Sequence, residues 1–181
     1  IPWFRPDEGA FRVIPGDYVP TEEGTGIVHI APTFGADDAK VAKAAGVPGL
    51  VVIDRNGDPQ AQVDPRGRFY RVEDLDPEYV KERVSDEYRE WAGRYVKNAY
   101  DDSLPADAPT LDVDLCVMMK STGKVFRIEK HVHSYPHCWR TDKPVLYYPL
   151  NSWFIRTTAV REKMMELNNG ITWKPESTGT G

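Results

Sequence analysis

Glu23-Gly24-Thr25-Gly26-Ile27-Val28-His29-Ile30-Ala31-Pro32-Thr33-Phe34-Gly35-Ala36-Asp37-Asp38 is the stretch that decides the fold. Residues 27–30 are β-branched apart from His29 and are bounded by glycine and by Ala31-Pro32, which predicts a short strand. On such a strand His29 lies near the end, on the face opposite its two neighbours. A helix is expected over about residues 36–45, with Gly46 as its stop. The stretch therefore predicts a strand, a tight loop and a helix start that gather a histidine and two carboxylates.

Asp37 and Asp38 fall in the first turn of the expected helix. Unpaired backbone N–H groups and the helix dipole favour negative charge there. One aspartate can cap the helix while its neighbour faces elsewhere, and such a carboxylate is suited to bind an ammonium group. The plainer interpretation is an ordinary capped helix, with His29 as a partly buried, hydrogen-bonded core residue.

Two long motifs carry a family resemblance. GTGIVHIAPTFGADD, residues 24–38, resembles the segment that carries the editing pocket of the class I aminoacyl-tRNA synthetases for isoleucine and valine. HSYPHCWRTDKPVLYYPLNSWFI, residues 133–155, resembles the isoleucine enzymes of that family. Two long motifs in order are more specific than one short pattern. The resemblance implies an α+β fold, a partial β-barrel of the editing-domain type with flanking helices. It also implies an incomplete editing-domain portion over residues 1–132 and a connection toward the catalytic core over residues 133–181.

The resemblance also implies roles for particular residues. Asp38 matches the aspartate that binds the substrate's α-ammonium group, and His29 matches the histidine that bounds the side-chain pocket and helps to reject isoleucine. Thr33, Phe34 and Gly35 lie in the intervening loop and are expected to contribute pocket walls. The implied reaction is hydrolysis of valine attached in error to tRNA(Ile), by a positioned water and with no serine or cysteine nucleophile. A hydrophobic pocket distinguishes one methylene by only about 10- to 200-fold, and isoleucine against valine in this family is the standard example.

Several family features have no counterpart in this chain. They are the Thr-rich strand that forms the other wall of the editing pocket and the HIGH and KMSKS signatures that handle ATP. We therefore expect a segment that forms no aminoacyl-adenylate, binds no cofactor and leaves ATP and Mg²⁺ to the catalytic domain of its parent enzyme. The expected partners are the acceptor end of tRNA(Ile) and the remainder of the synthetase in the same chain, as a monomer without membrane contact.

The rest of the chain predicts short elements. Strands are expected at residues 13–14, 50–53 and 69–72, with residues 55–58 as a hairpin turn. Pro77 opens a helix expected from Asp76 to about Asn98, followed by a loop at residues 101–109. A helix capped by Asp112 and a strand over residues 125–133 complete the prediction. The apolar face of the long helix is assigned to the core and consists of Tyr79, Val80, Val84, Tyr88, Trp91 and Tyr95.

Composition limits the class of protein. The 181 residues suffice for one domain with a core, and no run approaches the roughly 20 apolar residues of a spanning helix. Two cysteines, Cys116 and Cys138, suit a reducing cytoplasm. The start at Ile1-Pro2, without methionine, indicates a piece of a longer chain. A net charge of −5 argues against a broad basic surface for nucleic acid.

Two other functions stay open. His131, His133, His137 and Cys138 fall within eight residues and could form a zinc site, although Thr141 stands where relatives often carry a second cysteine. A non-catalytic RNA-binding module could instead stack bases on aromatic side chains, although the apolar neighbours of these side chains favour burial. Those aromatic side chains are Trp139, Tyr147, Tyr148, Trp153 and Phe154.

Overall fold

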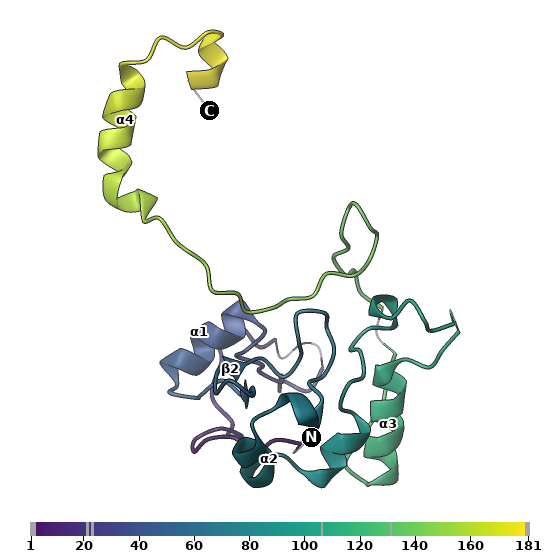
Figure 1. The fold of residues 1–181 in the computed structure, drawn as a ribbon. Coiled ribbons are helices and arrows are strands. Elements are labelled where there is room, and N and C mark those ends of the chain that lie inside the picture. The colour runs from purple at the N-terminus through teal and green to yellow at the C-terminus, as the bar shows by residue number, and fades with distance from the viewer. Residues whose placement is uncertain (1–2, 21, 23, 106, 131, 180–181) are drawn as a thin grey trace. The chain divides into compact units, whose positions relative to one another are not determined.

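The computed structural model describes residues 3–20, 22, 24–105, 107–130 and 132–179. The chain forms two compact units, residues 1–149 and residues 150–181. Unit 1 contains the sheet and helices α1 to α3, and unit 2 contains α4 (Figure 1). The functional boundary expected at residues 132–133 stays a prediction.

Helix α1 (Ala36–Ala44) confirms the helix predicted after the deciding stretch. Gly35 is its N-cap, and Gly46 follows it with φ of 65°, a left-handed conformation that glycine adopts at no steric cost. The strand predicted over residues 27–30 is wrong: these residues join no ladder, and the Ile27 side chain is 73% exposed. β-Branched residues favour strands because they pack on a neighbouring strand, and no described segment offers one here.

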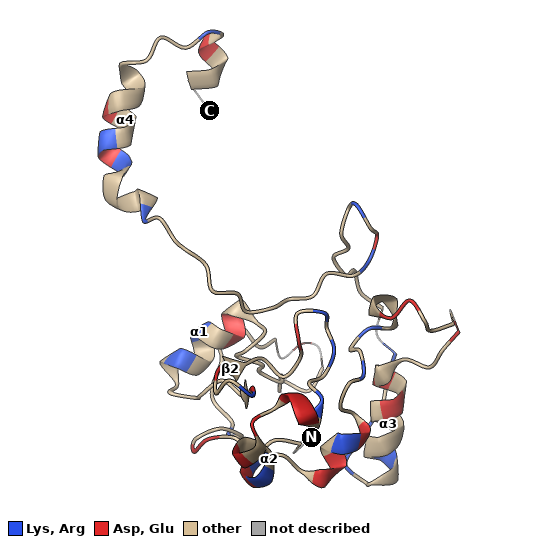
Figure 2. Cartoon of the chain, in the orientation of Figure 1, with Lys and Arg blue, Asp and Glu red and all other residues tan. Residues whose placement is uncertain are grey.

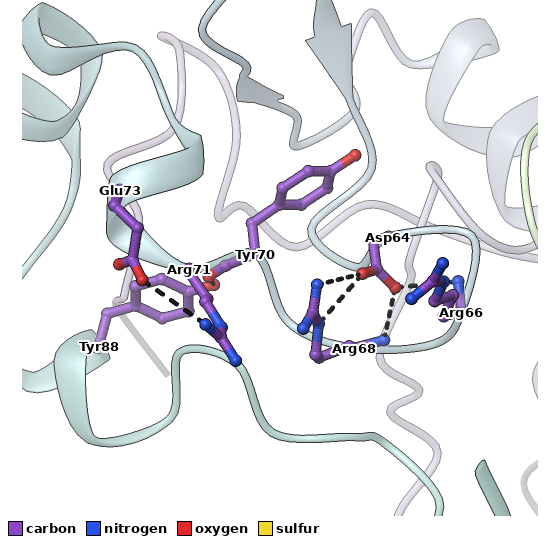
Figure 3. A network of polar contacts seen from close by, with 7 residues as sticks. All are labelled: Asp64, Arg66, Arg68, Tyr70, Arg71, Glu73 and Tyr88. Atoms are coloured by element: carbon purple, nitrogen blue, oxygen red, sulfur yellow. Dashed lines mark hydrogen bonds and ion pairs between the residues drawn. The ribbon is translucent and has the colours of Figure 1, made fainter. Parts of the chain in front are cut away.

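The sheet consists of β1 (Val52–Ile53) and β2 (Pro59–Gln60), which pair antiparallel. The turn between them confirms the predicted hairpin. The Asp54 carboxylate accepts the N–H groups of Asn56 and Asp58 at 2.8 and 3.0 Å, which orders the turn. A turn with the same hydrogen-bond pattern follows ten residues later, where the Asp64 carboxylate accepts the N–H groups of Arg66 and Arg68 (Figure 3).

Helix α2 (Pro77–Arg83) begins as predicted, with Pro77 in the first turn and Asp76 accepting the Tyr79 N–H at 2.8 Å. Its predicted continuation to Asn98 is wrong. Val84 leaves the helix to bridge Phe4, and the Ser85 N–H donates to the Trp3 carbonyl at 2.8 Å. The chain continues through the 3₁₀ turns η2 (Asp86–Glu90) and η3 (Asn98–Tyr100), while η1 (Val72–Asp74) and isolated bridges replace the strand predicted at residues 69–72.

The core of unit 1 is aromatic. Its buried cluster consists of Trp3, Phe4, Val52, Leu75, Tyr88, Trp91 and Leu111. The Trp3 and Phe69 rings meet edge to face at 5.4 Å, and the Tyr88 hydroxyl donates to the Tyr70 carbonyl at 2.6 Å (Figure 3). The core assignment of the predicted apolar face is confirmed except at Tyr95, which is partly buried outside this cluster.

Helix α3 (Leu111–Ser121) confirms the predicted helix, but its N-cap is Thr110 and Asp112 lies within the first turn. The described residues of the 101–109 segment form the predicted loop, apart from an isolated turn. The strand predicted over residues 125–133 is wrong for its described residues, which form no ladder and expose Phe126 fully. Acidic and basic residues are interspersed along the elements of unit 1 (Figure 2).

Unit 2 contains η4 (Thr157–Val160), α4 (Arg161–Asn169) and η5 (Glu176–Gly179). None of its described residues is buried. In the described part of the whole chain, helices and one two-stranded sheet make a mixed α+β fold, and no described helix has the length and apolarity needed to cross a membrane.

Candidate functional site

A cavity of about 810 Å³ opens beside the deciding stretch in unit 1. Its walls are largely apolar and come from segments far apart in the sequence. His29, Thr33 and Phe34 contribute to it together with residues 10–16, 18 and 19. Arg12 ties that N-terminal segment to α1 by donating to the Ala45 carbonyl. A volume in this range suits a small organic ligand, because ligand sites typically measure about 300–1,000 Å³.

The turn that presents Thr33 and Phe34 is held by backbone and side-chain hydrogen bonds. The N–H groups of Phe34 and Gly35 both donate to the Ala31 carbonyl at 3.0 Å. The Thr33 hydroxyl donates to the Leu50 carbonyl at 2.6 Å, which connects the turn to the segment that leads into β1. The turn is therefore fixed at both ends before any ligand arrives.

Asp38 braces this turn. Its Oδ2 accepts the Ala31 N–H at 2.9 Å, and the side chain is partly buried, whereas Asp37 is exposed. A Cβ on Gly35 would lie 2.7 Å from that Oδ2 atom, so the carboxylate occupies this position only because residue 35 is glycine. No hydrogen bond of Asp38 Oδ1 occurs among the described residues. This oxygen is available to a ligand that reaches the turn.

The structure thus separates the predicted site residues into two sets. His29, Thr33 and Phe34 line the cavity, whereas Asp38 and Gly35 lie outside its lining and support the turn. The interpretation of His29 as a partly buried core residue is wrong, because His29 is exposed at the cavity wall.

Sequence reasoning missed two aromatic residues at this cavity. Tyr135 and Tyr147 line it from residues 133–181, the expected connection to the catalytic core, in which Tyr147 was considered only for base stacking. The Tyr135 hydroxyl donates to the Val145 carbonyl at 2.9 Å, and the Lys97 ammonium lies 4.9 Å from the centre of the Tyr135 ring. No local spacing signals this arrangement, since it depends on how residues 133–149 fold back on unit 1.

The cysteine and histidines of the alternative zinc site have other contacts. His131 lies outside the described residues, and the His137 ring contacts the Tyr135 carbonyl at 2.9 Å. The hydroxyl of Thr141, followed by the N–H groups of Arg140 and Thr141, holds the pKa of the Cys138 thiol below its usual value. No group of three or more candidate ligands comes together among the described residues.

The aromatic side chains considered for RNA binding differ in exposure. Trp139 is 83% exposed, and Trp153 and Phe154 are almost fully exposed, so the expectation of their burial is wrong within the described residues. Tyr148 is partly buried, and this burial raises its pKa.

Comparison with known proteins gives one consistent result. No family model matches the chain. The chain is 64% identical over its full length to the isoleucine–tRNA ligase of Bacteroides fragilis and covers 16% of that protein. It is 62% identical, again over its full length, to the isoleucine–tRNA ligase of Porphyromonas gingivalis, also covering 16% of it. Over 97% of its length it is 38% identical to that of Thermoplasma volcanium, of which it covers 14%. The chain therefore spans about one sixth of the length of these relatives.

Proposed function

Because the chain belongs to the isoleucine–tRNA ligase family, as a segment of such an enzyme, we propose that it forms part of the editing site that removes valine from mischarged tRNA(Ile). The observation that carries the proposal is the cavity, which His29, Thr33 and Phe34 line. Its apolar walls suit an aliphatic side chain, and its volume exceeds what a valine side chain alone needs.

The proposed reaction is hydrolysis of an ester. A water attacks the carbonyl carbon of the valyl ester, the bond to the ribose oxygen breaks, and free valine and the ribose hydroxyl form. The α-ammonium group of the substrate binds Oδ1 of Asp38. The other carboxylate oxygen of Asp38, Oδ2, accepts the Ala31 N–H and so braces the turn. This placement requires the ammonium group to lie at the edge of the cavity, because Asp38 itself does not line it.

His29 is proposed to set the size limit of the pocket. Its exposed ring borders the cavity, and one added methylene on the substrate would compete with the ring for space. Exclusion of isoleucine from the editing pocket would add to the selectivity of the aminoacylation site, which distinguishes isoleucine from valine by only about 10- to 200-fold.

The partial barrel belongs to the same proposal. Pairing of a Thr-rich strand from elsewhere in the synthetase would extend the two-stranded sheet and add a wall to the cavity. In the whole enzyme we further propose ATP- and Mg²⁺-dependent isoleucine activation at another domain, contact with the acceptor end of tRNA(Ile), and action as a monomer in the cytoplasm.

The test is deacylation of valyl-tRNA(Ile) by a full-length ligase that carries this segment. His29→Ala and Asp38→Asn are each compared with the parent protein, and isoleucine activation is measured alongside. Altered deacylation with unchanged activation supports the proposal, whereas unchanged deacylation in both variants contradicts it.

A further inference from the structure

The walls of the cavity beside the deciding stretch differ in charge from the chain as a whole. Among the described residues that line the cavity, Arg12 is the one permanently charged residue, and no aspartate or glutamate is present. The whole chain is acidic, with 28 aspartate and glutamate residues against 23 lysine and arginine residues. The lack of carboxylates in the lining is therefore a local property of this site, and it favours an anionic group in the ligand.

Arg12 borders the cavity without a carboxylate partner. Its guanidinium donates to the Ala45 carbonyl, which is a neutral acceptor, and it forms no ion pair with a described residue. A guanidinium has five N–H donors in a fixed fork, so the contact with Ala45 leaves donors for a second acceptor. Arg12 is exposed, so a ligand at the cavity can reach it.

Lys97 places a second cation next to the same cavity. Its ammonium lies 4.9 Å from the centre of the Tyr135 ring, and both Tyr135 and the preceding Val96 line the cavity. Contact with an aromatic ring leaves the positive charge in place. Lys97 is half-buried and forms no ion pair within the described part of the chain. Because partial burial of an unpaired charge is unfavourable, an anion that binds there accounts for this position better than folding alone does.

We propose that Arg12 and Lys97 bind phosphate groups of the acceptor end of tRNA(Ile), so that the esterified ribose lies at the cavity. RNA carries one negative charge per nucleotide, and lysine and arginine are the side chains that neutralise it. The cavity of about 810 Å³ also leaves room for more than a valine side chain. Arg12 and Lys97 come from separate segments, so each can contact a phosphate of its own.

Two local contacts agree with the net charge of −5, which argues only against a broad basic surface. The inference rests on the proposed function, because it assigns Arg12 and Lys97 a binding role in the same reaction. It concerns the placement of the substrate and leaves the roles of His29 and Asp38 unchanged.

The experiment measures deacylation of valyl-tRNA(Ile) by the full-length ligase at several salt concentrations. Arg12→Gln and Lys97→Gln each remove one positive charge. Each should raise KM about tenfold, the lower end of what a hydrogen bond to a charged group contributes. The kcat should stay within about twofold, because the contact is the same in the ground state and the transition state. The slope of log(kcat/KM) against log[salt] should become shallower by about 0.7, the value for one phosphate contact on a single strand.

Two further variants serve as controls. Lys97→Arg keeps the charge and should keep both KM and the salt slope close to the parental values. Lys120→Gln removes the same charge from an exposed position on α3 that does not line the cavity, so it should change neither quantity. Arg12 and Lys97 variants that behave like Lys120→Gln would overturn the proposal. A raised KM with an unchanged salt slope would also overturn it, because the side chain would then act through folding and not through a phosphate.

The outcomes separate this inference from the editing proposal. If His29→Ala and Asp38→Asn both leave deacylation unchanged, the editing proposal fails, and the role of Arg12 and Lys97 in that reaction fails with it. If those two variants alter deacylation while the Arg12 and Lys97 variants keep the parental salt slope, only the phosphate contacts are refuted.

Discussion

Asp38→Asn separates the two tasks assigned to Asp38, bracing the turn and binding an ammonium group. Asparagine keeps a side-chain oxygen that can accept the Ala31 N–H now 2.9 Å from Oδ2. The substitution removes the negative charge and almost nothing else. The turn that presents Thr33 and Phe34 should therefore persist, while any ion pair with the substrate's ammonium group is lost.

The expected sizes follow from these contacts. A hydrogen bond to a charged partner contributes about 1.5–3 kcal/mol, which corresponds to roughly 10- to 150-fold slower deacylation of valyl-tRNA(Ile). Folding stability should fall by only about 0.3–1 kcal/mol, the contribution of a carboxylate near a helix N-terminus. Asp38→Ala should lose about 0.5–2 kcal/mol of stability, because the Ala31 N–H then has no side-chain acceptor.

The assay compares full-length ligases carrying Asp38→Asn, Asp38→Ala and the control Asp37→Asn. Asp37 lies in the same first turn but is exposed, so its substitution should leave deacylation within about twofold of the parent rate. Isoleucine activation should be unaffected in all three. If Asp38→Asn deacylates at the parental rate while Asp38→Ala is slow, Asp38 serves only to brace the turn and the ammonium role is refuted.

Three further predictions concern other parts of the chain. His29→Ala should enlarge the pocket so that isoleucyl-tRNA(Ile) is hydrolysed, and a variant that still spares isoleucine would show that the ring does not limit the site. Burial raises the pKa of Tyr79 to about 12, above its unfolded value, so its stabilising contribution should be complete below about pH 10 and decline as pH rises toward 12. Tyr79→Phe should weaken this alkaline loss in denaturant titrations and cost about 0.5–1.5 kcal/mol at pH 7, because the hydroxyl donates to the Val51 carbonyl. The isolated 181-residue chain should deacylate valyl-tRNA(Ile) far more slowly than a chain extended to include the Thr-rich strand, and equal rates would place the catalytic site elsewhere.

The features that could be predicted from sequence depend on contacts close along the chain. The α1 boundaries, the Asp76-Pro77 start of α2 and the hairpin after β1 are each set by residues within a few positions of one another. The end of α2 could not be predicted, because it is set by backbone contacts with Trp3 and Phe4, about 80 positions away. The same holds for Tyr135 and Tyr147 at the cavity, which depend on the return of residues 133–149.

Two of the wrong strand predictions, those over residues 27–30 and 125–133, have a common physical cause. Residues 27–30 and the described part of residues 125–133 have the composition or alternation of strands, yet neither pairs with another described segment and both expose apolar side chains. A β-branched or alternating segment is stabilised as a strand by pairing with a neighbouring strand. Its sequence pattern therefore indicates a strand, but the partner strand can come from another part of the protein. The exposed Ile27 and Val28 also line the cavity, next to His29. The Thr-rich strand proposed to extend the sheet would add a wall to the cavity that residues 27–30 line. The chain extended to include that strand is therefore the informative comparison for both the barrel and the editing site.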